Sequence, residues 1–334
     1  MRVAPILGIP RLLAGMGLDP NQLIAEAGLD LVLFDDPDNI IPFADLGRFV
    51  ALCVERTRCP HFGLLVCRNA GLEILGLVGE LARHSPDVGT ALRNIILYLH
   101  LHDRGAIPIL SVRGDRVMLA YSIHQPGVPG TEQIYDGAIA NAFNIVKALA
   151  GPDWKATEVL LHRPQPVDCE PYRQFFRTRL IFGAEYSAVV FAASWLDRRL
   201  DGADALVHRR IMQEIESLEA QGAGDLVTQL RRVLRRMLVV STPQGETRLG
   251  QMADLFALHR RTLNRRLCAQ GTSFRVLIDE ARYDIARHLL RDTRLPVSDI
   301  AAALDYSECA AFVRAFRRWS GTSPTAWRTE HAPY

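Results

Sequence analysis

The sequence predicts an α+β N-terminal domain over residues 10–203, a linker over 204–225, and an all-α C-terminal domain over 226–331 with two helix-turn-helix units joined by a long helix. Three observations support this fold class. At 334 residues the chain is longer than one ordinary hydrophobic core accommodates. Its N-terminal part mixes helical periodicity with β-rich runs, whereas its C-terminal part shows helical periodicity and an internal repeat. With 49% hydrophobic and 23% charged residues, the composition is that of a globular protein and argues against disorder.

The first hundred residues show the periodicity of helices. One helix is predicted to begin at Ile41–Asp45, because apolar side chains then recur at helical spacing, at Leu46, Phe49, Val50 and Cys53. Another is predicted over Ala91–Tyr98, with Ser85 as its N-cap and Pro86 in its first turn.

A β-hairpin is predicted next. Two β-rich runs, residues 107–112 and 117–123, flank Arg113-Gly114-Asp115-Arg116, and the Gly-Asp pair is typical of a tight turn. The remaining elements expected in this domain are one helix and two strands, at residues 132–149, 156–161 and 188–191.

The linker is predicted to be partly helical. Apolar residues recur at helical spacing, and two glycines then end the pattern, at Leu206, Ile211, Ile215, Leu218, Gly222 and Gly224. The second domain is expected to open with a helix at 225–240 and a turn at 241–245.

The C-terminal part contains two similar units. Three pairs of segments correspond at offsets of 48, 49 and 50 residues, namely 252–256 with 300–304, 263–267 with 312–316, and 271–274 with 321–324. The offset grows one residue at a time, as expected if the units differ only in their turns. Each unit is predicted to be a short helix, a tight turn and a longer helix, and a helix over 274–290 is predicted to join them.

In the first unit, the short helix is expected at 249–256 and the second helix from Arg260. Leu263 and Leu267 lie one turn apart and are expected to anchor that helix, while Arg261, Asn264 and Arg265 fall on other faces. Arginine can bind guanine and asparagine can bind adenine through paired hydrogen bonds, so these residue types suit a helix in a major groove. The alternative is that Arg260–Arg266 is only a solvated surface.

In the second unit, the short helix is expected from Val297 and the longer one after Ser307, which we expect to be its N-cap. The longer helix should direct its aromatic residues inward and its arginines outward, respectively Phe312, Phe316 and Trp319, and Arg314, Arg317 and Arg318.

Charge is distributed unevenly between the two parts of the chain. Residues 241–334 hold 14 Arg, no Lys and 10 acidic residues, an excess of four positive charges. Residues 1–240 hold 25 basic and 27 acidic residues. Because guanidinium groups bind phosphates and guanine edges bidentately, the C-terminal part is the one expected to meet a polyanion.

The C-terminal domain resembles the DNA-binding domain of AraC/XylS-family transcription regulators. The similarity extends over about residues 230–330 and is carried by residues 281–290, 297–301, 306–308, 312–319, 321–324 and Arg328. It implies base-reading positions at Arg261, Asn264 and Arg265 in the first unit, and at Cys309, Ala310 and Arg314 in the second. The other expected DNA contacts are Arg260, Arg266, Arg317 and Arg318.

Two residues depart from the family pattern. Asp305 stands where a turn glycine is usual, and aspartate tolerates the left-handed backbone that such a turn can need. Cys309 and Ala310 are short where longer polar residues are common. We therefore expect the second helix to bind phosphate and to read few bases.

The N-terminal domain resembles the effector-sensing, arabinose-binding-like domain of the OruR/VirS-like branch of the same family. The similarity is carried by residues 71–79, 85–92, 175–184 and 189–191. It implies an effector-binding or dimerisation role, and the helical opening argues against the jelly-roll sugar pocket of the family's namesake. Two polar clusters are candidate effector contacts, Tyr98 with His102 and His162 with Arg163; the alternative is that they are surface or satisfied core positions.

No catalytic residue, cofactor or metal site is predicted. Ser111, His124 and Asp136 lack the G-x-S-x-G turn of a nucleophilic serine, and no phosphate loop, dinucleotide fingerprint or zinc spacing occurs. Cys53, Cys59 and Cys67 are expected to be buried thiols, with a redox or metal sensor as the alternative. No apolar run is long enough to span a membrane, and a cytoplasmic protein is expected.

The sequence therefore predicts an effector-responsive, sequence-specific regulator, an activator rather than a repressor. Its expected partners are double-stranded promoter DNA, a small-molecule effector, RNA polymerase and a second copy of the chain. One alternative is a DNA-repair or other enzyme that carries the same DNA-binding module and uses a reactive cysteine, such as Cys59 beside Arg58 or Cys67 beside Arg68. Another is a dimeric regulator that needs no ligand.

Overall fold

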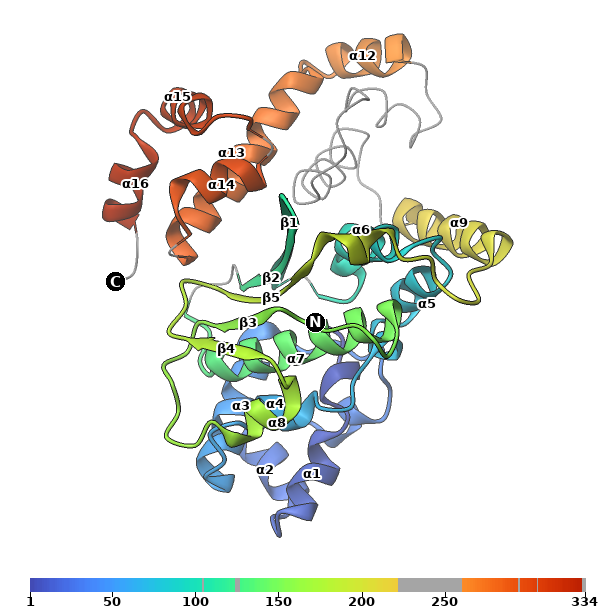
Figure 1. Ribbon diagram of the computed structural model, residues 1–334, viewed down its shortest axis with the longest axis vertical. Helices are drawn as coiled ribbons and strands as arrows, with labels where there is room; N and C mark the ends of the chain where they lie inside the picture. Colours follow the sequence, from blue (N-terminus) through green and yellow to red (C-terminus); the bar gives the residue numbers. More distant parts are fainter. Residues whose placement is uncertain (104, 124–126, 222–259, 294, 305, 332–334) are drawn as a thin grey trace. The chain divides into compact units, whose positions relative to one another are not determined.

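The computed structural model describes the whole chain except residues 104, 124–126, 222–259, 294, 305 and 332–334 (Figure 1). The chain divides into two compact units, Met1–Met212 and Gln213–Tyr334, and this boundary lies inside the segment assigned to the linker. Unit 1 combines helices with a sheet and the described part of unit 2 is helical, which confirms the predicted fold class. Among the described residues, no helix is both long and apolar enough to cross a membrane.

Helices are the most frequent elements of the described part of unit 1. They are α1 (Ile9–Gly15), α2 (Pro20–Glu26), α3 (Phe43–Thr57), α4 (Phe62–Val66), α5 (Leu77–Arg83), α6 (Val88–Tyr98), α7 (Thr131–Ala150), α8 (Glu170–Phe176) and α9 (Ala205–Gln221), which continues past the unit boundary. Short 3-10 turns lie at Ala4–Ile6, Leu31–Phe34, Leu72–Leu75, Leu99–Leu101 and Ala193–Asp197. The predicted helices α3 and α7 are confirmed, and the apolar stripe of α3 is buried as expected.

The sheet of unit 1 has five strands in the order β1-β2-β5-β3-β4. Their bounds are β1 (Ala106–Arg113), β2 (Arg116–Ile123), β3 (Glu158–Leu161), β4 (Arg179–Phe182) and β5 (Ser187–Ala192). The chain reverses between β1 and β2 at Gly114 and Asp115, and Gly114 adopts a left-handed φ of 58° that glycine tolerates without strain, so the predicted hairpin is confirmed. All pairings are antiparallel except that of β3 with β4.

Helices α6 and α7 hold the sheet against the rest of unit 1. Helix α7 contacts β2 and β5 as well as α3 and α4, and α6 contacts β1 and α7 (Figure 1). The interior is close-packed with fully buried apolar side chains, the largest of which include Phe49, Phe62, Tyr172 and Phe191. One mixed sheet with helices is unlike the paired sheets of a jelly roll, in agreement with the expectation from the helical opening.

The predicted start of α6 is wrong by two residues. Its N-cap is Asp87, whose backbone is extended and whose carboxylate accepts a hydrogen bond from the Thr90 N–H at 2.6 Å. Ser85 cannot cap this helix, because its hydroxyl is buried and donates to the carbonyl of Leu81 at 3.0 Å. Aspartate, like serine, is a strong N-cap residue. The sequence therefore contains two candidate N-caps, Ser85 and Asp87, and the folded chain uses Asp87.

The described helices of unit 2 are α12 (Arg260–Ala269), α13 (Phe274–Asp292), α14 (Val297–Ala303), α15 (Cys309–Ser320) and α16 (Pro324–His331). Helix α12 agrees with the predicted second helix of the first helix-turn-helix repeat, and α13 agrees with the predicted connecting helix. Helices α14 and α15 agree with the two helices predicted for the second repeat. The helices expected at 225–240 and 249–256, the turn at 241–245 and the turn residue Asp305 lie outside the described residues.

The two repeats use the same chemistry to end one helix and begin the next. Gly271 after α12 and Gly321 after α15 both have positive φ, 71° and 80°, as is usual where a glycine ends a helix. Ser273 and Ser323 then accept hydrogen bonds from the backbone N–H groups of Val276 and Ala326, at 3.3 and 3.2 Å. The Gly-Thr-Ser repeat seen in the sequence is therefore a repeat of structure.

The expected N-cap of α15 is wrong. Glu308, not Ser307, occupies the cap position, and its side chain makes no capping hydrogen bond. The helix begins one residue later than a serine cap at position 307 requires.

Candidate nucleic-acid interface and buried cavity

Helix α12 separates an anchoring face from a polar face. Leu263 and Leu267 are fully buried, as their spacing predicted. The side chains predicted to contact DNA, Arg261, Asn264, Arg265 and Arg266, are all exposed. Arg260 is the first residue of the helix. The described surface of α12 thus carries guanidinium and amide groups that can reach a ligand without desolvating the core.

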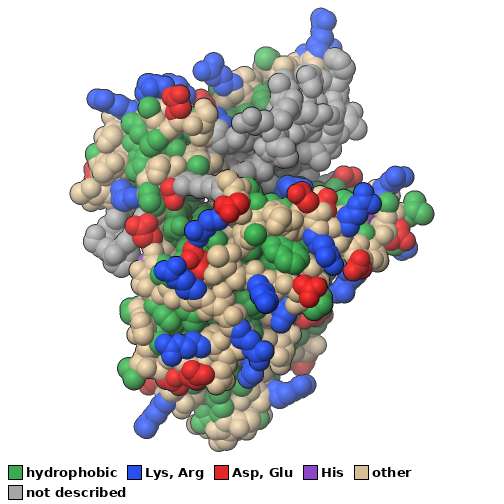
Figure 2. All heavy atoms as spheres, viewed as in Figure 1, with side chains coloured by type: hydrophobic (Ala, Val, Ile, Leu, Met, Phe, Trp, Pro, Cys, Tyr) green, Lys and Arg blue, Asp and Glu red, His purple; other side chains and the backbone are tan. Residues whose placement is uncertain are grey.

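Helix α15 shows the same division. Phe312, Ala315 and Phe316 form its buried face, whereas the predicted contact residues are exposed, namely Cys309, Ala310, Arg314, Arg317 and Arg318. Figure 2 shows basic side chains projecting from the surfaces of α12 and α15. Trp319 is half-buried rather than fully internal.

Arg318 differs from the other arginines of α15 because it has an internal partner. Its guanidinium donates to the carboxylate of Asp279 on α13 at 3.0 Å and lies 5.9 Å from the ring centroid of Trp319. Its side chain is still 57% exposed. The ion pair positions α15 on the connecting helix. Arg314 and Arg317 have no such ion pair within the described part of the chain.

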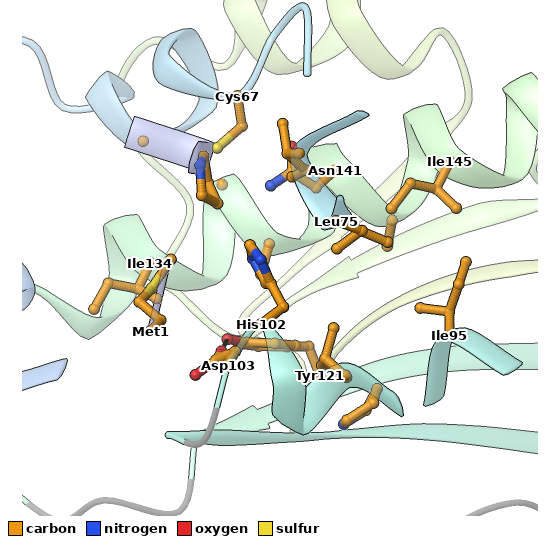
Figure 3. Close-up of a pocket in the computed structure, with 18 of the residues that line it drawn as sticks. Met1, Cys67, Leu75, Ile95, His102, Asp103, Tyr121, Ile134, Asn141 and Ile145 are labelled. Atoms are coloured by element: carbon orange, nitrogen blue, oxygen red, sulfur yellow. Dashed lines mark hydrogen bonds between the residues drawn. The ribbon is translucent and has the colours of Figure 1, made fainter. Parts of the chain in front are cut away.

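Unit 1 contains a partly open cavity of about 140 Å³ (Figure 3). Its walls are mainly aliphatic and come from the N-terminus, α3, α4, α6, α7, β1, β2 and the 3-10 turns at Leu72–Leu75 and Leu99–Leu101. They include Ile6, Val50, Leu75, Ile95, Ile134 and Ile145. The polar lining groups are Cys67, His102, Asp103, Tyr121, Gln133 and Asn141. A mainly apolar cavity with a few polar groups is the usual form of a small-molecule site.

The polar groups of the cavity are uncharged or paired. His102 is only 6% exposed, and burial together with the nearby Arg2 and N-terminal charges lowers its pKa to about 3, so the imidazole is neutral at pH 7. Asp103 accepts hydrogen bonds from the Gly105 N–H at 2.7 Å and from the Tyr121 hydroxyl. Burial raises the pKa of Tyr121 well above its usual value, and the neighbouring Asp103 adds to this shift.

The four predicted effector contacts lie in different places. His102 lines the cavity, and Figure 3 shows its ring pointing into it. Tyr98 is buried but lies outside the cavity lining. His162 is exposed, with Nδ1 2.9 Å from the carbonyl oxygen of Ala184. The structure therefore does not bring the two predicted clusters together around one ligand position.

Arg163, the fourth candidate, belongs to a buried network that joins three parts of unit 1. Its guanidinium donates to the carboxylate of Asp136 on α7 at 2.7 Å, to the hydroxyl of Tyr172 on α8 at 2.7 Å, and to the carbonyl of Pro60 at 2.8 Å. The Tyr172 hydroxyl also donates to Asp136 at 2.6 Å. Such a set of bonds is typical of a structural ion pair.

Two family models match the chain in sequence. Residues 17–200 match the arabinose-binding domain of AraC transcription regulators, and residues 252–330 match a helix-turn-helix domain. The chain belongs to the AraC family of transcription regulators. It is therefore a transcription regulator with an AraC-type DNA-binding domain, and α12 and α15 lie in that domain.

Curated relatives within the AraC family match nearly the whole chain. The regulator VirS of Mycobacterium tuberculosis is 28% identical over 98% of this chain and 96% of its own length. The ornithine utilization regulator of Pseudomonas aeruginosa is 24% identical over 95% of this chain and 93% of its own length. The crystal structure of CdpR from Pseudomonas aeruginosa aligns with 92% of this chain and 96% of that chain, at 23% identity and a TM-score of 0.46.

Asn141 is a cavity residue of this AraC-family chain that the sequence reasoning did not single out. It lies on α7 with Ile134, Ala138 and Ile145, at positions that share one face of a helix and line the cavity together. An amide among small and apolar residues at helical spacing is the signal that could have found it.

The buried cysteines Cys53, Cys59 and Cys67 lack the signature of a nucleophile. Burial raises the pKa of Cys53 and of Cys67 to about 12 and also raises that of Cys59, so these thiols are protonated at neutral pH. Within the described residues, no cluster of three or more histidine, cysteine or acidic side chains could hold a metal ion. Cys268 and Cys309 are exposed.

Proposed function

We propose that this AraC-family chain is an effector-responsive transcription activator that binds specific promoter sequences. The observation that carries the proposal is the cavity of unit 1, which lies in the region matched by the family's effector-binding domain and contains two buried polar atoms without partners. A ligand that binds this cavity more tightly in one conformation of the chain shifts the population toward that conformation.

In DNA binding, the exposed faces of α12 and α15 have different roles. Helices α12 and α15 enter successive major-groove segments about one helical turn apart. Arg261, Asn264 and Arg265 read bases from α12, with Arg260 and Arg266 at its flanks. Helix α15 binds mainly phosphate, because Cys309 and Ala310 offer short side chains while Arg314 and Arg317 are exposed.

The remaining partners follow from the proposed activity. The protein acts in the cytoplasm as a homodimer on double-stranded DNA, and contact with RNA polymerase raises transcription, as the family resemblance implies. No cofactor or metal takes part.

A selection from fragmented genomic DNA tests the proposal. Purified full-length chain should enrich a small number of fragments that share a sequence motif, and placing one fragment before a reporter gene should raise expression when the chain and its effector are present. Enrichment of all fragments alike would contradict sequence-specific binding. Equal reporter expression with and without every tested metabolite would contradict effector response.

A further inference from the structure

The cavity of unit 1 presents two polar atoms that lack hydrogen-bond partners. These are Nδ1 of His102 and Oδ1 of Asn141; both are inaccessible to solvent, and both residues line the cavity. Figure 3 shows both side chains among the residues that line the cavity. Buried polar atoms in native proteins are nearly always paired, so two unpaired atoms on the walls of one cavity indicate the position of a bound polar group.

Asp103, Tyr121 and Gln133, three other polar groups of the cavity, are already engaged, and Cys67 interacts with the side chain of Asn141. Gln133 accepts a hydrogen bond from the Gly63 N–H and donates one to the carbonyl of Pro60, both at 2.8 Å. Both carboxylate oxygens of Asp103 accept hydrogen bonds, from Gly105 and Tyr121. The acceptor on Asn141 and the imidazole of His102 are therefore the groups that remain for a ligand.

The charge of the cavity excludes several kinds of ligand. No lysine or arginine occurs among the described residues that line it, and Asp103, the acidic residue among them, is paired. The terminal ammonium group of Met1 donates to the carbonyl of Ile41 at 2.8 Å. The guanidinium of Arg2, whose charge acts on His102, is also paired, with Asp38. A carboxylate or a zwitterion would therefore lose its hydration among aliphatic walls with no unpaired cationic side chain among the described lining residues, which is costly.

The size and the two atoms together define a ligand class. A cavity of about 140 Å³ is close to the roughly 150 Å³ that accommodates a six-carbon ring. Asn141 Oδ1 can only accept a hydrogen bond, whereas the neutral imidazole can donate or accept. A hydroxyl group satisfies both, because one oxygen atom donates one hydrogen bond and accepts others.

We infer that the cavity binds an uncharged, mainly apolar alcohol of about six carbon atoms, whose hydroxyl group donates to Oδ1 of Asn141 and contacts the ring of His102. This inference rests on the proposed function, since it names the chemical class of the effector.

Isothermal titration calorimetry of the full-length chain with matched probes tests the inference. The probes are 1-hexanol and cyclohexanol, the ether 1-methoxypentane, which is an isomer of hexanol without a donor, and the charged hexanoate and hexylammonium ions. Saturable binding of at least one of the two alcohols is expected. The ether should bind at least about fivefold more weakly than hexanol, since it loses one hydrogen bond to a buried acceptor. The charged probes should not bind detectably.

Variants locate the site. Asn141→Leu should abolish the preference for hexanol over its ether isomer, while His162→Leu, which changes an exposed histidine outside the cavity, should leave that preference unchanged. If Asn141→Leu does not fold, the probe series on the unaltered chain decides. Binding of the ether or a charged probe as tightly as hexanol, failure of both alcohols to bind, or a preference that survives in Asn141→Leu overturns the inference.

The outcomes separate this inference from the proposed function. A charged metabolite that binds the chain and changes its affinity for an enriched DNA fragment would overturn the alcohol class and leave the proposed function standing. DNA binding that responds to no small molecule of any class would contradict both.

Discussion

The exposed arginines on α12 and α15 have different proposed roles. Their substitutions should therefore affect DNA binding in different ways. Arg265 lies on the polar face of α12 beside Asn264, where bidentate contact with a base edge is sterically open. Arg317 lies on α15, where the neighbouring contact positions are short and phosphate binding is the proposed role. Arg318 is held by Asp279 and serves the fold as well.

Replacing Arg265 by alanine should weaken binding to the cognate DNA by about 1–3 kcal/mol and relax discrimination at one base position. Fluorescence anisotropy with a set of single-base operator variants measures both effects. Arg317→Ala is the matched comparison, because it should weaken cognate and bulk DNA alike and make the salt dependence shallower. Arg173→Ala, an exposed change on α8 of unit 1, should leave DNA binding unaltered. A uniform loss on all operator variants after the Arg265 change would show that this residue does not read bases.

We expect His102 to make the stability of unit 1 depend on pH. Its pKa is about 3 in the folded chain and about 6.5 when exposed, so below pH 6.5 the unfolded chain takes up a proton that the folded chain does not. Stability from this group is therefore complete above pH 6.5 and is lost as the pH falls. Between pH 7.5 and 5 the free energy of unfolding should fall by about 2 kcal/mol more in the unaltered chain than in His102→Gln. Urea unfolding at a series of pH values measures this, and His162→Gln, an exposed control, should keep the full pH dependence. Parallel pH profiles for the unaltered chain and His102→Gln would disprove the assignment.

At the scale of elements, the Arg163 network joins α7, α8 and the segment that follows β3. Because Asp136 is 1% exposed, removal of its guanidinium partner leaves a buried carboxylate without a counter-charge. We expect Arg163→Met to lower the free energy of unfolding by about 3–5 kcal/mol. Asp136→Asn in the same chain should restore part of the loss, since it removes the uncompensated charge. Chemical denaturation of the two single variants and the double variant tests this; equal stability of Arg163→Met and the unaltered chain would contradict a structural role.

Elements with a strong local signal were predictable from the sequence. Helix α7 has an apolar stripe, the β1–β2 turn has its Gly-Asp pair, and the repeated Gly-Thr-Ser sequence ends one helix and begins the next. Strand β4 was missed, because four residues carry no clear alternation and its parallel pairing with β3 is decided by contacts remote in sequence. The cap at Asp87 was missed, because Ser85 carries a similar local signal.

The two candidate sites also differ in how far they could be predicted from the sequence. The exposed faces of α12 and α15 follow from helical periodicity, because Leu263 and Phe312 each mark the buried side of a helix. The cavity does not, because it is a space left between elements far apart in the chain, from Met1 to Ile145. His102 was singled out for its chemistry, whereas Asn141 acquires its significance only from the enclosing walls.

For the whole molecule, the proposed function requires that a ligand in unit 1 changes DNA binding by unit 2. Helix α6 lines the cavity with Leu92, Ile95 and Ile96, and its Asn94 lies 3.2 Å from Nε2 of His208 on α9, the helix that continues past the unit boundary. Burial lowers the pKa of His208, so this contact joins two neutral groups at pH 7. A ligand that shifts α6 would therefore shift a helix in direct contact with α9.

Substitution of Asn94 by alanine should reduce the coupling between effector and DNA without removing either binding activity. The side chain also donates to the hydroxyl of Ser85 at 3.1 Å, so Ser85→Ala is the control for that second bond. The measurement is the ratio of DNA affinities with and without effector, which is a coupling free energy of typically about 1–3 kcal/mol in such systems. An unchanged ratio in Asn94→Ala would show that the coupling takes another route.

On the proposed function, the full-length chain recognises particular duplex sequences through the arginine-bearing helices of unit 2. The most direct test is its affinity for an enriched genomic fragment and for bulk DNA over a series of salt concentrations. We expect the fragment to bind at least about 10³-fold more tightly, with both affinities falling as salt rises. Equal, salt-insensitive affinity for the fragment and for bulk DNA, with and without small molecules, would contradict sequence-specific recognition by these helices.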